Sequence, residues 1–493
     1  MFRQYVAVAF MTLALAGTGA FGYITIKDLN DHGNQVAQVV GPGGTEVTTG
    51  AAGASPSAGA VNPLGGSSST AVSSLTGGST AGAPKSVANT QAASGVTGDK
   101  IITGGFFDMT GPVDSSVERD TVKSYFALIN AQGGINGRKL VFIDCDSKYD
   151  AVQTHNCANE MVAAHVLATV GVTAPKGENE QVSFLTQQEG IPWVGGLGTP
   201  EEYKYPLAYP VSPSFAFSGN ALAGEFQLSQ KSSPYYRHPA ILYIADVPWV
   251  QPVLDAIVAA LKKIGVTPTT IEAANATDGD YTGHVANLKL KNDKGPCASP
   301  PEEAGSCPDS LIAATDPFSY ARLFQAMDRV GWHPPLVAGG LDKGNQQSAY
   351  GDQLGCPSCG TGGQPRYAQS LVPFASPLDP ANSSNPTVQS YLNAVQRYYP
   401  SQVPALDIYT QIAWSAAQVF VEAAKRAGSN LTRVSLVNAL NSIKNFNTGW
   451  STPLSYSAGA SHDPNHCYYF MKHDPKTFDD GGTWRQYTGL NCY

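Results

Sequence analysis

The chain lacks an excess of positive charge, and this absence excludes one broad class of function. It has 30 Lys and Arg residues against 38 Asp and Glu residues, a formal net charge of −8. Nucleic-acid-binding proteins normally present a positively charged surface to phosphate groups, and the net negative charge of this chain does not favour such a surface. The sequence therefore predicts no nucleic-acid partner.

Motifs for catalysis and metal binding are also missing. There is no nucleophile elbow and no His-Glu-x-x-His pair, and the 9 His residues are scattered. Cys356 and Cys359 resemble a zinc knuckle or a redox pair, but no second pair stands at knuckle spacing and their surroundings are Gly-rich. We interpret them as part of a small structural loop, and we predict no enzyme activity, no metal and no cofactor.

The first 31 residues contain a long run without charge. Tyr5 to Ile26 is a run of 22 uncharged residues, and at ~1.5 Å per residue a helix of that length spans roughly 33 Å, enough for a bilayer core. Residues 1–31 therefore form either a transmembrane anchor or a cleaved signal peptide. The absence of a nearby cysteine excludes a lipid-modified anchor. Both alternatives place the rest of the chain outside the cytoplasm, at the cell surface or in the periplasm.

Residues 32–97 contain too few large apolar side chains to build a core. Gly, Ala, Ser, Thr and Val dominate, and Glu46 and Lys85 are the only charged residues. We predict a disordered tether, because such a composition cannot offset the entropy cost of ordering. A spacer that crosses a cell wall or carries sugars would have the same composition.

All eight cysteines lie between Cys145 and Cys492. An even number in an exported chain predicts disulfides. Nearest-neighbour pairing closes the shortest loops. It gives Cys145–Cys157, Cys297–Cys307, Cys356–Cys359 and Cys467–Cys492.

From residue 98 onward the pattern alternates strands with helices. Short apolar runs indicate strands at 101–107, 140–143, 166–172 and 192–195, and again at 240–244, 270–272, 310–314 and 336–338. Between them, apolar residues recur every three or four positions, as in amphipathic helices. This order predicts two α/β sets with parallel sheets, and therefore two lobes. Two further helices are expected at 386–398 and 405–427, followed by short strands.

Two segments carry a family resemblance. Residues 107–112 read FDMTGP, and residues 130–140 read NAQGGINGRKL, on either side of the first predicted helix. The chain thus resembles the leucine/isoleucine/valine-type (type I) periplasmic binding proteins of ABC importers. The resemblance implies two doubly wound, Rossmann-like lobes joined by three hinge crossings. The first lobe would comprise residues 98–211 and 374–450, and the second residues 212–373 and most of 451–493.

The resemblance also places a ligand site between the lobes. In the first lobe, Thr173 and Thr199 match positions that hold a ligand carboxylate in the family, beside Ala174 and Gly198. Ser115 and Ser116 stand where a Tyr is common. Helix N-termini in these loops would add N–H donors. Threonine before a helix can equally be a plain N-cap.

The second lobe is expected to supply an aromatic wall and an acid for an amine. Trp249 follows a strand at a position where relatives place an aromatic side chain. Asp342 corresponds approximately to the acidic residue that pairs with the ligand amine in the family. Asp316 lies in a third loop that would face the cleft. Trp249 could instead cap the lobe surface, and Asp316, followed by Pro317, could be a helix N-cap.

Reversible capture of a small polar solute, an amino acid or an amide, is the function that these features favour. The expected partners are an ABC permease and its ATPase, with membrane attachment through the N-terminal segment. A ligand-sensing surface receptor with the same lobes and no transport partner is the alternative. A structural protein of the cell surface is a third possibility. A neighbouring permease gene would favour import, and a neighbouring kinase gene would favour sensing.

Overall fold

Strands and helices alternate from Lys100 onward, as the sequence predicts. The computed structural model describes residues 94–231, 235–290, 308–332, 334–339, 369–377, 379–459, 462, 466–473 and 484–493. The expected N-terminal hydrophobic segment, most of the expected tether and Asp342 lie outside these residues. So do Cys297, Cys307, Cys356 and Cys359.

Five parallel strands form the first sheet, in the order β2-β1-β3-β4-β5. They are β1 (Lys100–Phe107), β2 (Lys139–Asp146), β3 (Thr169–Val170), β4 (Trp193–Val194) and β5 (Ala208–Tyr209). β1 is mostly buried, because helices cover both faces of the sheet.

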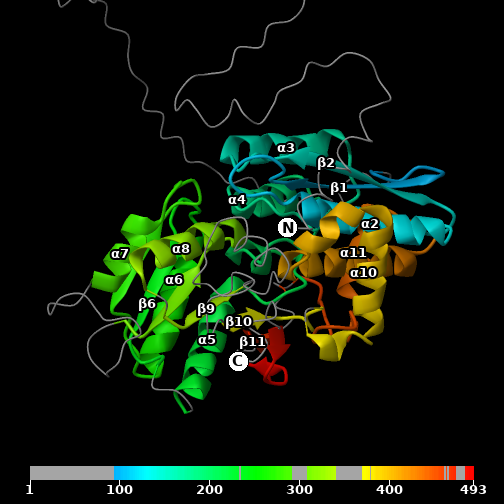
Figure 1. The fold of residues 1–493 in the computed structure, drawn as a ribbon. Helices are drawn as coiled ribbons and strands as arrows, with labels where there is room; N and C mark the ends of the chain where they lie inside the picture. The colour runs from blue at the N-terminus through cyan, green and yellow to red at the C-terminus, as the bar shows by residue number, and fades with distance from the viewer. Residues whose placement is uncertain are drawn as a thin grey trace, which may run out of the picture. The chain divides into compact units, whose positions relative to one another are not determined.

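Helices from two distant parts of the chain cover the first sheet. α3 (Ala151–Ala163) and α4 (Glu178–Ser183) lie on one face, while α2 (Ser116–Ala131) and α11 (Ile408–Ala427) lie on the other (Figure 1). α10 (Pro386–Tyr398) packs on α2, and α12 (Arg433–Asn441) packs on α11. α4 is followed directly by a π-helical turn. Short helical turns are Phe184–Gln188, Pro200–Tyr203, Pro380–Asn382 and Pro400–Ala405.

α11 is the central helix of this layer, and most of its side chains are buried. Its Trp414 packs edge-on against Tyr125 of α2, with ring centroids 4.7 Å apart, and against Tyr391 of α10 at 5.4 Å. On the sheet side, Gly195 has a φ of +65°, and a Cβ there would lie 2.6 Å from the Cβ of Ala416. Glycine is therefore needed at this turn, where the chain passes directly under α11.

The second sheet has a parallel centre and an antiparallel edge. Its order is β12-β11-β10-β9-β8-β6-β7, with β13 paired to β11. The parallel strands are β6 (Pro239–Ile244), β7 (Thr270–Ala274), β8 (Ser310–Ala314), β9 (Leu336–Gly339) and β10 (Gln369–Val372). The antiparallel ones are β11 (Cys467–His473), β12 (Trp484–Gln486) and β13 (Asn491–Cys492), which confirms the expected C-terminal strands.

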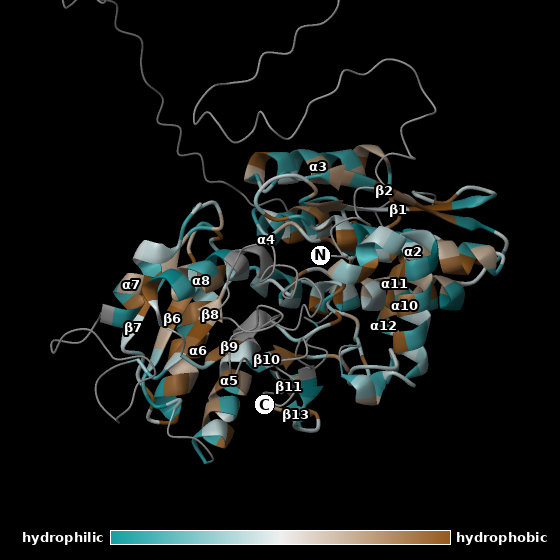
Figure 2. Ribbon diagram, viewed as in Figure 1, coloured by the Kyte–Doolittle hydropathy of each residue, from teal (hydrophilic) through white to brown (hydrophobic). Residues whose placement is uncertain are grey.

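Helices also cover the second sheet. α5 (Phe215–Gln230) and α6 (Val250–Lys263) pack together over one set of strand side chains, which includes Ile241 and Ile312. α7 (Thr282–Leu290) and α8 (Pro317–Val330) pack over the alternate set. The strands β6 and β8 between these helices are mostly hydrophobic (Figure 2).

The chain crosses between the two sheets three times. It leaves the first sheet after β5, returns after β10 to build α10, α11 and α12, and leaves again before β11. We call β1–β5 with α2–α4 and α10–α12 the first lobe, and β6–β13 with α5–α8 the second lobe. The crossings touch one another, because the Tyr456 hydroxyl donates to the Pro210 carbonyl (2.8 Å) and the Ala375 N–H donates to the Trp450 carbonyl (2.7 Å).

Candidate functional site

A cleft opens where the strands of both sheets end. Residues that follow β1, β2, β3, β4 and β5, together with the start of α11, line it from the first lobe and the crossing. Residues that follow β6 and β8, together with α5 and α6, line it from the second lobe. The space between them, including the part open to solvent, is about 1350 Å³. Ligands of open parallel sheets bind at these carboxyl ends.

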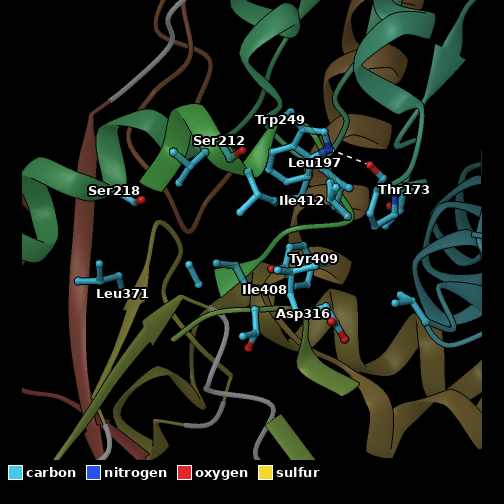
Figure 3. A pocket seen from close by; sticks show the side chains of 18 of the residues that line it. Thr173, Leu197, Ser212, Ser218, Trp249, Asp316, Leu371, Ile408, Tyr409 and Ile412 are labelled. Atoms are coloured by element: carbon cyan, nitrogen blue, oxygen red, sulfur yellow. Dashed lines mark hydrogen bonds between the residues drawn. The ribbon is translucent and has the colours of Figure 1, made fainter. Parts of the chain in front are cut away.

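Four of the residues singled out from the sequence line the cleft together. Ser115 and Thr173 do so from the first lobe, and Trp249 and Asp316 from the second. Figure 3 shows Thr173, Trp249 and Asp316 around the cleft. Asp316 also caps α8, because its carboxylate accepts the N–H of Ser319 at 2.9 Å. Its roles as helix cap and as cleft residue therefore coexist. Four other expected residues are not part of the lining, namely Ser116, Ala174, Gly198 and Thr199.

Two buried glutamates accept hydrogen bonds from the backbone of the loops that follow β3 and β4 in the first lobe. Glu178 accepts the N–H groups of Ala174 and Leu197, both at 2.9 Å. Glu202 accepts those of Gly198 at 2.7 Å and Thr199 at 2.9 Å. The backbone donors that the sequence suggested for a ligand carboxylate are thus already bound to carboxyl groups of the protein. Thr199 is fully buried on this inner side.

Burial shapes the ionisation of both glutamates. It raises the pKa of Glu202 to about 7, against hydrogen bonds from Thr199 and Gly198 that lower it. It also raises the pKa of Glu178 well above its usual value, and the neighbouring Glu202 raises it further. Two carboxyls in one dry site resist ionising together. Glu202 therefore takes up a proton as the pH falls through 7.

This ionisation predicts a pH-dependent stability. A glutamate titrates near 4.5 when the chain is unfolded, whereas Glu202 titrates near 7 in the folded protein. The folded state then binds more protons between these values, so the stabilising contribution is complete below pH 4.5 and is lost as the pH rises through 7. Glu202→Gln keeps an oxygen acceptor and cannot ionise. We expect its melting temperature to match wild type at pH 5 and to exceed it at pH 8. Parallel melting curves at both pH values would contradict the assignment.

A direct contact joins the lobes across the cleft. The indole N–H of Trp249 donates to the Pro175 carbonyl at 2.8 Å, a bond drawn in Figure 3. Beside it, Lys176 Nζ lies 3.9 Å from the Asp246 carboxylate. We call these two contacts the latch. Because the latch residues follow β3 and β6, the latch holds the two walls of the cleft together.

Aromatic side chains complete the cleft wall. Tyr149 is placed by Asp108, whose carboxylate accepts the Tyr149 N–H at 2.7 Å and the Ser147 hydroxyl at 2.6 Å. Burial raises the pKa of Asp108 to about 6. From α11, Tyr409 also lines the cleft. Burial raises the pKa of its hydroxyl, and the negative charges of Asp407, Asp316 and Glu118 raise it further.

The sequence pattern did not predict the apolar part of the cleft lining. It consists of aliphatic side chains on α5, α6 and α11 and on the strands of the second sheet, such as Leu222, Ile257 and Leu371. The predicted polar solute therefore meets a lining in which aliphatic and aromatic side chains outnumber polar ones. Their spacing is that of ordinary core residues, so the sequence carries no separate signal for them.

Two of the four expected disulfides fall within the described residues, and both are present. They are Cys145–Cys157, which links β2 to α3, and Cys467–Cys492, which links β11 to β13. In the part of the chain that the structure describes, no three His, Cys, Asp or Glu residues gather in a metal-binding arrangement. Nor does any helix there have the length and apolar character needed to span a membrane.

The comparison with protein families matches the cleft-bearing part of the chain. Residues 100–482 match the model described as "Periplasmic binding protein". The chain belongs to this family. Periplasmic binding proteins are solute-binding proteins, and the expected type I α/β fold with parallel sheets is thereby confirmed. No curated protein matched the sequence.

Solved structures of the same fold bind different solutes. The chain is similar to a fatty acid ABC transporter substrate-binding protein from Thermomonospora curvata, with a TM-score of 0.64 and 18% identity over 80% of this chain and 94% of that one. It is also similar to a branched-chain amino acid ABC transporter protein from Thermus thermophilus with bound valine, with a TM-score of 0.63 and 15% identity over 80% and 97%. At these identities the likeness shows the fold alone.

Proposed function

We propose that this periplasmic binding protein captures a small-molecule solute outside the cytoplasm and delivers it to an ABC importer, without chemistry on the solute. The observation that carries the proposal is the cleft, which both lobes line at the carboxyl ends of their strands. Relatives of the same fold are, by their titles, parts of ABC transporters for fatty acids and branched-chain amino acids. The permease and ATPase are the proposed partners, and the N-terminal segment is the proposed membrane attachment.

Native mass spectrometry of freshly purified protein tests the binding step. We expect a mass above that of the chain, which returns to the chain mass after mild denaturation and releases a solute. Deleting the gene should then abolish uptake of that solute by whole cells. A protein that carries no solute, and that no compound in a broad metabolite screen stabilises, would overturn the proposal. Normal uptake after deletion would overturn only the delivery to an importer.

Loosening the latch should open the lobes. Trp249→Phe keeps an aromatic ring and removes the donor to the Pro175 carbonyl, a hydrogen bond with a net value of ~0.5–1.5 kcal/mol. We expect a larger radius of gyration for the ligand-free variant in small-angle scattering, because closure loses a contact made only across the cleft. Trp332→Phe is the matched control, since Trp332 is buried in the second lobe away from the cleft. An equal change in both variants, or none in Trp249→Phe, would show that the latch does not govern closure.

A further inference from the structure

The cleft continues into the core of the second lobe. Six of its lining residues belong to the hydrophobic core cluster that α5 and α6 form with the second sheet. We call them the apolar chamber: Leu222, Val253, Ile257, Ile312, Leu371 and Tyr468. In Figure 3, Leu371 lies at the opposite end of the cleft from Thr173. The chamber is therefore an extension of the cleft rather than a separate void.

An empty apolar cavity inside a protein core lowers the stability of the folded state. Protein interiors pack as densely as organic crystals, and an unfilled hollow costs ~24 cal/mol per Å³ in proteins where this has been measured. A hollow lined by aliphatic side chains stays dry and takes up apolar molecules. All six residues are at most 6% exposed, so this wall is as buried as a finished core. We expect an apolar part of the ligand to fill this cavity.

The chamber, together with the apolar cleft lining beside it at Val250, is longer than a single branched side chain. Along α6, the lining runs from Val250 through Val253 to Ile257, which spans roughly 10 Å at 1.5 Å per residue. On α5, Leu222 of the chamber lies one turn from Ser218, which lines the cleft. A chain of several methylene groups matches this length, whereas the side chain of valine or leucine would leave most of it empty.

Outside the apolar chamber the cleft lining includes acidic side chains, and we call this part the mouth of the cleft. Asp114, Glu118 and Asp316 line it, and no Lys, Arg or His is found in the lining among the residues that the structure describes. The nearby backbone N–H groups of Ala174, Leu197, Gly198 and Thr199 already donate to Glu178 and Glu202. A carboxylate at this point would lose its hydration and meet like charge, which costs free energy.

We propose that the solute is amphipathic: an extended hydrocarbon part fills the apolar chamber, and a head group without negative charge lies at the mouth of the cleft. This inference rests on the proposed function of solute capture. Trp249 and Tyr409 line the same cleft, and such aromatic faces favour a cationic amine over a neutral head. Tyr149 is not counted with them, because Lys176 Nζ already lies 5.2 Å from the centroid of its ring. The ligand class thus differs from both amino acids and fatty acid anions.

Isothermal titration of the full chain with three matched series tests the proposal. The probes are n-alkylamines, n-alkanols and n-alkanoates of four to ten carbons, with valine as a reference. Burial of one CH₂ is worth ~0.8 kcal/mol, so affinity should rise about fourfold for each added carbon until the chamber is full. At equal length, amines should bind most tightly and alkanoates most weakly.

A pair of substitutions on α6 locates the hydrocarbon chain. Ile257→Ala enlarges the chamber, so the chain length that binds best should increase by one or two carbons. Leu261→Ala is the matched control, since Leu261 is buried one turn further along the same helix and in the same core cluster but does not line the cleft. The length optimum of Leu261→Ala should equal that of wild type. Should Ile257→Ala fail to fold, Ile257→Val provides the same comparison in a milder form.

The possible results distinguish failure of the proposed ligand class from failure of the proposed function, solute capture. An affinity independent of chain length, or alkanoates binding more tightly than amines, overturns the inference. Tight binding of valine with no gain from longer chains also overturns it, while solute capture stands. If the purified protein carries no solute and no metabolite stabilises it, the proposed function itself fails. A length optimum that moves equally in both alanine variants shows that the chain lies elsewhere.

Discussion

Replacing Trp414 with alanine is expected to lower the free energy of unfolding by about 3–5 kcal/mol, the range for removing a large aromatic from a packed core. Trp414 is 1% exposed at the centre of α11. Its ring packs edge-on against Tyr125 and Tyr391, which lie on two other helices. The alanine variant loses both ring contacts and leaves a cavity between three helices. Denaturation by urea, followed by tryptophan-independent circular dichroism, measures the change.

The matched control is Trp414→Phe. The Trp414 indole N–H has no hydrogen-bond partner among the described residues, so phenylalanine gives up volume but no hydrogen bond. We expect it to cost about 1–2 kcal/mol, well below the alanine variant. If both variants unfolded at the wild-type urea concentration, α11 would not be a packed part of the first lobe. Equal large losses would mean that the indole N–H is bonded after all.

Removing the Cys145–Cys157 disulfide is expected to have the next largest effect. The bond spans 12 positions of sequence and joins β2 to α3. A loop of this size contributes ~3 kcal/mol, chiefly by restricting the unfolded chain. The double variant Cys145→Ala/Cys157→Ala should therefore melt below wild type under oxidising conditions.

A reducing agent supplies the control. In excess reductant the melting temperature of the wild type should fall, and that of the double variant should fall less, because the variant no longer has this bond to lose. The other described disulfide, Cys467–Cys492, is lost in both samples. Identical melting of the oxidised wild type and the double variant would show that Cys145 and Cys157 do not pair. Peptide mapping without reduction would then find both thiols free.

The order of strands and helices was predictable because buried strands and amphipathic helices have distinct periods. The strand expected at 310–314 is β8, Ser310–Ala314, and the helix expected at 386–398 is α10, Pro386–Tyr398. α5 was not predicted. It contains Gly219 and Gly224, and glycine disfavours a helix by ~1 kcal/mol. A Cβ at Gly219 would lie 2.8 Å from the Ala256 backbone, so contact with α6 explains glycine there.

The candidate site was only partly predictable. Ser115, Thr173, Trp249 and Asp316 follow strands of the alternating pattern, and loops after parallel strands meet at one edge. That Glu178 and Glu202 occupy the backbone donors behind Thr173 could not be predicted, since it depends on which way two helical side chains turn. The apolar chamber was equally hidden. Ile257 and Leu261 have the same spacing and chemistry in the sequence, and only the packing shows that one of them lines a cavity.

The three crossings impose an order on the folding of the chain. The strands of the first lobe end at Tyr209, but α11, which covers one face of them, ends only at Ala427. α2 already lies on this face over β1 and β2, but a chain that emerges from its N-terminus leaves the part over β3 and β4 uncovered until α11 has been made. The second lobe has its parallel strands complete at Val372. Since distant contacts form late, the lobe that comes second in the sequence is the one able to fold first.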